Sequence, residues 1–145
     1  MRVRVKRVGK VAIELPRAMT NGSVGMDLPA AIEEAVTLDP GERRLVPCGF
    51  ALAIPRGYEG QVRPRSGLAL RHGLGIPNAP GTIDPDYRGE VSVILINLST
   101  QPVRIEPGQR IAQLVICPVA HCVLEEADEL DPTPRGGGGF GHTSS

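Results

Sequence analysis

The chain has 145 residues, with 16 basic and 16 acidic side chains and a formal net charge of zero at pH 7. Proteins that grip a nucleic-acid backbone usually carry excess positive charge, so this balance argues against nucleic-acid binding, and an anion site must be built locally from a few arginines. The sequence contains no run of about 18 apolar residues, so we expect no membrane-spanning helix.

Short strands are the elements that the sequence predicts most often. Its 18 glycines and 14 prolines together form roughly a fifth of the chain, and they interrupt helices and favour turns. The length suits one domain with one hydrophobic core. In chain order, apolar patterning predicts strands at Val3–Val5, Val11–Leu15, Val36–Leu38, Phe50–Ile54, Val91–Leu98, Val103–Ile105, Ile111–Ile116 and His121–Leu124.

One short helix is predicted at Ser66–His72, with Ser66 as its N-cap and Gly73 as its end. Many short strands separated by turn signals favour an all-β fold. We therefore predict a distorted jelly-roll-like β-barrel or sandwich that contains this single helix.

The sequence changes character after Leu130, where it reads DPTPRGGGGFGHTSS. Four consecutive glycines do not hold a rigid conformation unaided, so we predict a β domain at residues 1–130 and a flexible arm at residues 131–145. One interpretation of the arm is a disordered terminus. The other is a lid, in which Arg135 and Phe140 bring one cation and one flat apolar ring to an anionic, aromatic ligand.

The cysteines Cys48, Cys117 and Cys122 are odd in number and lack the spacing of metal ligands. We expect them to be reduced and buried. The N-terminal sequence MRVRVKRVGK also lacks the apolar core of a signal peptide. Both observations favour a cytoplasmic protein.

Arg63–Ala69 is the first segment that contains candidate functional residues. The N-terminus of a helix offers free backbone N–H groups and the positive end of a dipole. Here two arginines precede that end, and Ser66 and Gly67 open the helix. The segment is therefore either a phosphate-binding site or a capped surface helix with exposed charges.

Asn78–Glu90 is the second candidate segment. Its Pro, Asp and Gly residues predict a hairpin whose exposed backbone groups could pair with the edge of a base. Asp84 lies at the end of a strand. Its carboxylate either orients a water molecule or has only a structural role, since Asp is common in turns. Asp86 is interpreted as a turn residue. The flat ring of Tyr87 lies close in sequence to Asp84. It either contacts a ligand or packs against other side chains.

Arg110–Leu114 is the third segment, and strand alternation places Arg110 and Ala112 on one face and Gln113 on the other. This pattern also suits an ordinary strand with one polar face. A fourth candidate is Asp27, an isolated acid in an apolar context. A structural hydrogen bond explains it as well as a functional role does.

Together these segments resemble the five ordered motifs of the trimeric dUTPase family, at near the usual spacing and over almost the whole chain. PRSGLA and GTIDPDYRGE are the most specific of them. The matching segments are GMDL at Gly25–Leu28, PRSGLA at Pro64–Ala69, GTIDPDYRGE at Gly81–Glu90, RIAQL at Arg110–Leu114 and RGGGGFG at Arg135–Gly141.

The resemblance implies a role for several residues at the nucleoside. Asp84 would hold and deprotonate the water that attacks the α-phosphorus. Tyr87 would lie against the deoxyribose and exclude a 2′-hydroxyl. The backbone from Thr82 through Ile83 to Asp84, on the hairpin, would read the uracil edge and leave no room for the methyl group of thymine. Asn78 would assist, and Ser92 on the returning strand would add a backbone contact.

The resemblance also implies roles at the phosphates. Asp27 would act in the outer shell of a magnesium ion or hold the site together. His142 stands where a Ser is frequent in the family and Ser144 where a Gly is frequent, so the tail donor to the terminal phosphate is either His142 or Thr143. The remaining contacts would come from Arg65, Ser66, Gly67, Arg110 and Gln113 at the phosphates, Arg135 at the γ-phosphate and Phe140 stacked on the uracil.

As a whole, the resemblance implies a homotrimer with active sites shared between subunits, each closed by the arm of a neighbour. It implies hydrolysis of dUTP to dUMP and pyrophosphate with Mg²⁺, which the substrate phosphates and water would hold without direct protein ligands. Two alternatives share the fold: a dCTP deaminase, with or without diphosphatase activity, and a catalytically silent nucleotide-binding or regulatory protein. The paired Asp84 and Tyr87 favour the diphosphatase.

Overall fold

The computed structural model describes residues 1–139. Short strands make up most of its regular structure, and one helix, α1 (Ser66–His72), lies within these residues. The strands are β1 (Arg4–Arg7), β2 (Met26–Pro29), β3 (Val36–Leu38), β4 (Arg43–Ala53), β5 (Tyr58–Arg63), β6 (Leu74–Gly75), β7 (Gly81–Ile83), β8 (Glu90–Asn97), β9 (Val103–Ile105) and β10 (Arg110–Pro118).

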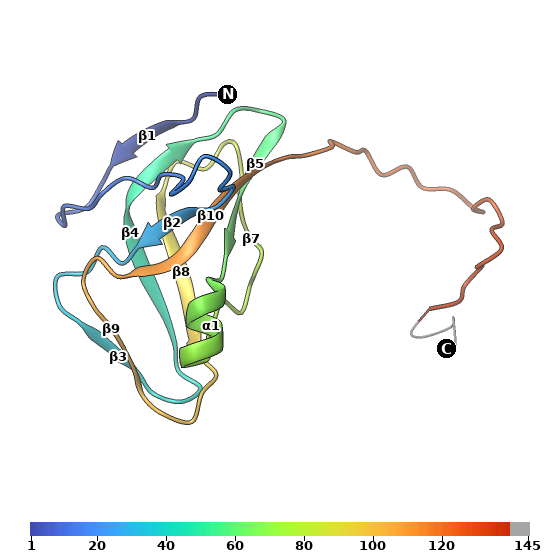
Figure 1. The fold of residues 1–145 in the computed structure, drawn as a ribbon. Helices are drawn as coiled ribbons and strands as arrows, with labels where there is room; N and C mark the ends of the chain where they lie inside the picture. The colour runs from blue at the N-terminus through green and yellow to red at the C-terminus, as the bar shows by residue number, and fades with distance from the viewer. Residues whose placement is uncertain (140–145) are drawn as a thin grey trace.

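The strands form two four-stranded antiparallel sheets and one two-stranded ribbon (Figure 1). The first sheet has the order β1-β4-β8-β6, and the second has the order β2-β10-β5-β7. The ribbon pairs β3 with β9. Strands that are neighbours in a sheet are often far apart in sequence, as expected of a jelly-roll-like fold. The predicted all-β class with one short helix is confirmed.

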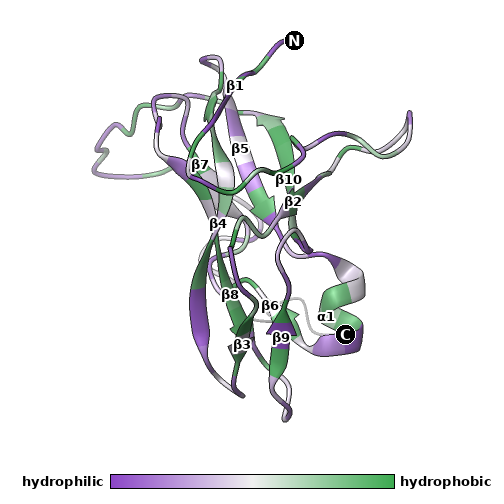
Figure 2. Cartoon of the chain, turned by 90° about the vertical axis from the view of Figure 1, so that its left-hand side faces the viewer, coloured by the Kyte–Doolittle hydropathy of each residue, from purple (hydrophilic) through white to green (hydrophobic). Residues whose placement is uncertain are grey.

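The core lies between the inner faces of the two large sheets. Along β8, the burial alternates, and Val91, Val93, Leu95 and Asn97 are buried. Figure 2 shows hydrophobic residues gathered along the strands of the body. Asn97 is fully buried, and its side-chain amide donates to the carbonyl oxygens of Leu38 and Gln101 at 2.9 and 2.8 Å. This polar group therefore remains hydrogen-bonded inside the core.

The strands β3, β8, β9 and β10 lie where apolar patterning placed them. The predictions at Val3–Val5 and Phe50–Ile54 are confirmed in part, because they overlap β1 and the end of β4. The segment Val11–Leu15 forms no ladder, so that prediction is wrong, although Ile13 and Leu15 do pack against the core. Residues 121–124 are exposed and have no regular structure, so the predicted last strand is absent there. Its apolar residues had suggested a strand, but they find no partner sheet within residues 1–139.

The bounds of the helix agree with the prediction, but its N-cap does not. Arg65 is the N-cap, in an extended conformation and without a side-chain cap, so Ser66 is the first helical residue. Gly73 ends the helix in the left-handed conformation, and its N–H donates to the Ala69 carbonyl oxygen at 3.0 Å. The predicted end is therefore confirmed and the predicted cap is wrong.

The chain leaves the body after β10 and runs outward as an extended segment (Figure 1). Residues 120–137 are exposed, and Arg135 Nε donates to the Gly138 carbonyl oxygen at 2.7 Å. The departure from the sheet thus occurs at Pro118, earlier than the predicted boundary at residue 131. Phe140, His142 and Thr143 lie outside the described residues.

The three cysteines differ in exposure. All are free, but only Cys48 is buried, whereas Cys117 is half-buried and Cys122 is exposed. The prediction of burial is therefore confirmed for Cys48 alone. Burial, together with the negative charge of Glu90, raises the pKa of the Cys48 thiol to about 12. Among residues 1–139, no helix has the length and apolar character needed to cross a membrane.

Candidate active site

Asp27 on β2 is the centre of a charged cluster. Its Oδ1 lies 2.9 Å from Arg65 Nε, and its Oδ2 lies 3.0 Å from Arg110 Nη1. Arg65 Nη1 also donates to the backbone carbonyl oxygen of Arg110 at 2.9 Å. Asp27 retains 20% of its side-chain exposure, so it fixes two guanidinium groups at the surface without burying them. We call Asp27, Arg65 and Arg110 the Asp27 cluster.

A β-bulge explains how Arg110 reaches Asp27. The register between β10 and β2 shifts between Arg110 and Ala112, and Ile111 and Ala112 are both buried. Strict alternation had placed Arg110 and Gln113 on opposite faces, and that prediction is wrong. Asp27 is the cross-strand partner of Gln113, and opposed residues share one face of an antiparallel pair. The bulge therefore brings Arg110 onto the face of Gln113.

Gln113 connects this face to the segment before α1. Its Nε2 donates to the carbonyl oxygen of Pro64 at 2.9 Å. Gly25 makes room for the amide, since a Cβ on this residue would lie 2.2 Å from Gln113 Oε1. Arg65 follows Pro64 directly, and Ser66 and Gly67 open the helix after it. Direct contacts thus join the candidate phosphate-binding residues of the GMDL, PRSGLA and RIAQL segments.

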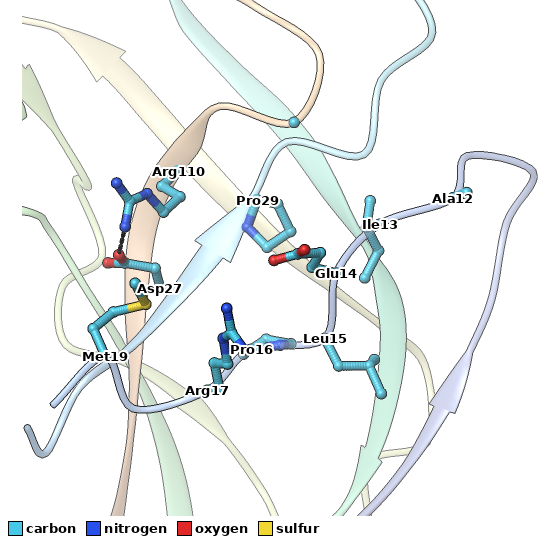
Figure 3. Close-up of a pocket in the computed structure, with 11 residues that line it drawn as sticks. Ala12, Ile13, Glu14, Leu15, Pro16, Arg17, Met19, Asp27, Pro29 and Arg110 are labelled. Carbon is cyan, nitrogen blue, oxygen red and sulfur yellow. Dashed lines mark hydrogen bonds and ion pairs between the residues drawn. The ribbon is translucent and has the colours of Figure 1, made fainter. Parts of the chain in front are cut away.

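The Asp27 cluster borders a hollow of about 470 Å³, which Figure 3 shows. The segment before β2 forms its other wall, and the side chains of Glu14 and Arg17 point into the hollow. Sequence reasoning missed both residues. Arg17 follows a proline in an irregular segment, and no pattern distinguished it from an ordinary surface cation.

A second cleft, of about 290 Å³, lies between the two large sheets where β7 and β8 separate. Asp84 and Tyr87 line it from the intervening loop, together with Glu90 at the start of β8. Leu45, Val62, Val91 and Ile94 provide apolar surface. The candidate nucleoside contacts that line this cleft are Asn78, Thr82, Ile83, Asp84, Tyr87 and Ser92.

Asp84 is exposed and also borders a second hollow of about 770 Å³, with Arg56, Asp86 and His121 in its lining. The Asp84 carbonyl oxygen accepts a hydrogen bond from the backbone N–H of Tyr87 at 3.1 Å, which closes a turn. The turn places Tyr87 beside the carboxylate. Solvent therefore has access to Asp84 both from the cleft and from this hollow.

Residues 84–89 do not form the predicted hairpin. β7 pairs with β5 in one sheet, whereas β8 pairs with β4 and β6 in the other. The segment is a turn that connects the two sheets, and the diverging strands leave the cleft between them. Its Pro, Asp and Gly residues gave a correct turn signal, but a turn signal alone does not specify which strands pair.

The structure thus divides the predicted site residues into two groups within residues 1–139. The nucleoside candidates surround the cleft, and the phosphate candidates surround Asp27; the residues that line the cleft and those of the Asp27 cluster do not overlap. Arg135 is exposed on the arm and belongs to neither group. Among the described residues, no group of three or more His, Cys, Asp or Glu side chains is arranged to hold a metal.

Comparisons with known proteins agree with this architecture. A family model for dUTPase matches residues 12–144. The chain is 60% identical over 143 residues to a deoxyuridine 5'-triphosphate nucleotidohydrolase of Anaeromyxobacter sp. (strain Fw109-5), covering 97% of this chain and 96% of that protein. It is 56% identical over 141 residues to the protein of the same name from Syntrophotalea carbinolica, covering 97% and 95%.

Solved structures show the same fold. The dUTPase of Staphylococcus bacteriophage 80alpha, with dUpNHpp, aligns with a TM-score of 0.89 at 28% identity and covers 99% of both chains. A mutant dUTPase of phage phi11 of S. aureus, described with a structural Mg(II) ion, aligns at 0.81 and 23% identity, covering 91% of this chain and 100% of that one. From the match of the family model and these close relatives, the chain belongs to the dUTPase family.

Proposed function

We propose that this dUTP diphosphatase uses the carboxylate of Asp84 to activate the water that attacks the α-phosphorus of dUTP. The observation that carries the proposal is the cleft that contains Asp84 beside the ring of Tyr87. Its volume of about 290 Å³ is close to the lower end of ligand pockets, a size that suits a nucleoside.

The base and sugar are proposed to enter this cleft. Backbone groups of Thr82 and Ile83 at the end of β7 would hydrogen-bond the uracil edge, with assistance from Asn78 and Ser92. Tyr87 is 46% exposed, so its ring presents a flat face to the ligand. A ring against the deoxyribose would exclude the 2′-hydroxyl of a ribonucleotide and so select dUTP over UTP.

The phosphates are proposed to bind at the Asp27 cluster together with Ser66, Gly67 and Gln113. Arg65 and Arg110 supply positive charge there, held in place by one carboxylate. Because this cluster and the cleft are separate sets of residues in one chain, we propose that the cleft of one copy faces the cluster of another. A homotrimer with shared sites, as in the family, provides this arrangement.

The arm is proposed to close the site of a neighbouring copy. The segment that leads to the arm follows β10 and runs outward from the body (Figure 1). Arg135 lies on the arm and is exposed. Arg135 would meet the γ-phosphate, Phe140 would stack on the uracil, and His142 or Thr143 would donate to the terminal phosphate. A closed lid excludes bulk water and strengthens the attraction between the arginines and the phosphates.

Mg²⁺ is the proposed cofactor. The residues of the chain fit an ion held by the phosphates and water, with Asp27 in its outer shell, because hard cations prefer oxygen ligands. Bound there, the ion would neutralise phosphate charge and fix the phosphate geometry.

In the reaction, the Asp84 carboxylate accepts a proton as the water oxygen forms a bond to the α-phosphorus. The bond from that phosphorus to the bridging oxygen of the β-phosphate breaks, and pyrophosphate leaves. Positioning and charge stabilisation provide most of the catalysis in phosphoryl transfer, so one carboxylate base is sufficient. The reaction removes dUTP, which would otherwise place uracil in DNA, and supplies dUMP for thymidylate synthesis, for which we propose a cytoplasmic location.

Pyrophosphate release from dUTP, dCTP, dTTP and UTP, measured with Mg²⁺, tests the proposal. We expect rapid release from dUTP and little from the other three nucleotides. Ammonia release from dCTP would identify a deaminase, and binding of dUTP without turnover would identify a silent nucleotide-binding protein. Either outcome would contradict the proposed mechanism.

A further inference from the structure

Glu90, the first residue of β8, holds the loop of Asp84 and Tyr87 by two separate bonds. Its side-chain Oε1 accepts a hydrogen bond from the backbone N–H of Gly49 at 2.8 Å. Its backbone carbonyl oxygen accepts a hydrogen bond from the Tyr87 hydroxyl at 3.1 Å. Glu90 is half-buried and lines the same cleft as both loop residues.

The bond to Gly49 ties the loop to an irregular point of β4. The ladder between β4 and β8 is continuous from Arg43 to Pro47 and resumes at Ala51, so Gly49 lies within a break in the register. A bulge leaves backbone groups without their ladder partners. The Glu90 carboxylate provides the partner for one of these groups, and the first residue of β8 is thereby fixed to the neighbouring strand.

The bond to Tyr87 fixes the ring along the backbone that leads into β8. A Cβ on Gly89 would lie 2.3 Å from the Tyr87 hydroxyl oxygen and 2.5 Å from its Cζ, so the ring lies across Gly89. Because this residue has no side chain, the hydroxyl reaches the Glu90 carbonyl oxygen. The ring orientation therefore depends on where the start of β8 is held.

We propose that Glu90 is a positioning residue for substrate selection. Its carboxylate holds the start of β8 against the β4 bulge, and its carbonyl group orients the ring of Tyr87 at the wall of the cleft. The inference rests on the proposed function, in which this ring meets the deoxyribose. Glu90 itself does not touch the reacting atoms.

The variant Glu90→Met tests the proposal, because it keeps most of the side-chain bulk and removes the acceptor. Glu90→Gln keeps an acceptor oxygen and serves as the conservative variant. Glu106→Met is the matched control, since Glu106 is an exposed glutamate that bonds Arg104 after β9. The chain contains only two tyrosines and no tryptophan, so ring-labelled tyrosine gives two NMR signals, from Tyr58 and Tyr87.

We expect Glu90→Met to shift or broaden the Tyr87 signal and to leave the Tyr58 signal unchanged. The ratio of kcat/KM for dUTP to that for UTP should fall by at least about tenfold, within the range of up to about a hundredfold expected when a binding group is displaced by about 1 Å. Glu90→Gln should restore both readouts, and Glu106→Met should match the original protein. An unchanged Tyr87 signal in folded Glu90→Met would overturn the proposal.

A shifted Tyr87 signal with an unchanged ratio would support positioning by Glu90 and contradict the proposed role of Tyr87 at the sugar. The two proposals therefore fail separately. If Glu90→Met does not fold, Tyr87→Phe provides a second test, because it removes only the bond to the Glu90 carbonyl oxygen. We expect a lower dUTP to UTP ratio for Tyr87→Phe. An unchanged ratio in Tyr87→Phe, together with a lower ratio in Tyr87→Ala that shows the ring at the sugar, would overturn the positioning of the ring by Glu90.

Discussion

Asp27 and Gln113 are cross-strand partners on β2 and β10, and their side chains share one face of the sheet. Asp27 binds Arg65 and Arg110, whereas Gln113 binds the carbonyl oxygen of Pro64. A single pair of opposed residues therefore connects segments that are widely separated in sequence. This connection explains how three short motifs become one cationic surface.

Replacement of Asp84 by Asn should leave dUTP binding nearly unchanged and lower kcat by about 10²–10⁴-fold, because the amide does not accept the proton of the attacking water. Isothermal titration with a non-cleavable dUTP analogue gives the affinity, and pyrophosphate release gives kcat. Asp86→Asn is the control, since Asp86 belongs to the same turn and is not assigned a catalytic role. Turnover retained by Asp84→Asn would contradict the role of Asp84 as the base.

Replacement of Asp27 by Asn should release the guanidinium groups of Arg65 and Arg110. We expect kcat/KM for dUTP to fall by at least about tenfold and the affinity for dUMP to change less, because the lost contacts concern the triphosphate. Glu106→Gln is the control, since its ion pair with Arg104 is exposed at both side chains, and such pairs contribute little. An equal loss of affinity for dUTP and dUMP would instead indicate general damage to the fold.

Replacement of Gly25 by Ala should displace Gln113, because the new Cβ would lie 2.2 Å from Gln113 Oε1. The bond to Pro64 would then break, and we expect kcat/KM to fall by on the order of tenfold, with a smaller change in the melting temperature. Gly22→Ala is the control, since a Cβ there meets nothing within 4 Å. Equal activity of the two variants would show that Gln113 does not need this space.

Deletion of residues 135–145 should preserve the fold and remove most of the activity. Residues 120–137 are exposed after β10 ends at Pro118, so we expect the sheets to fold without the deleted segment. Loss of a cation and of the lid should lower kcat/KM by on the order of a hundredfold. Circular dichroism checks the fold, and a truncated protein with full activity would contradict the lid.

The sequence identified candidate functional side chains, but it did not predict how they are arranged. Asp84, Arg65 and Gln113 were each identified within short motifs, since a motif records residue types at fixed spacing. The bulge that brings Arg110 beside Asp27 was not predicted, because one extra residue in a strand changes no hydrophobic pattern. The crossing between sheets at residues 84–89 was mistaken for a hairpin, because both arrangements use the same turn residues.

The strands β2, β5, β6 and β7 lie outside the predicted strand segments, and β2 and β5 were missed for a related reason. The inward positions of β5 include Gly60 and Val62, with polar residues between them, so its apolar signal is weak. β2 is only four residues long and ends in a proline. Both strands pair with β10, one on each side. This pairing makes them strands, whereas their own residues give only a weak strand signal. Local pattern is a poor guide where long-range pairing supplies the stability.

The separation of the cleft from the Asp27 cluster has a consequence for mixed assemblies. In the proposed homotrimer, each active site takes its nucleoside wall and its cationic wall from different subunits, so two defective variants would compensate each other. If a subunit damaged only at Asp84 assembles with one damaged only at Arg65, some active sites contain an intact cleft and an intact Asp27 cluster. A mixed assembly of the two variants would then retain partial activity that neither variant possesses alone.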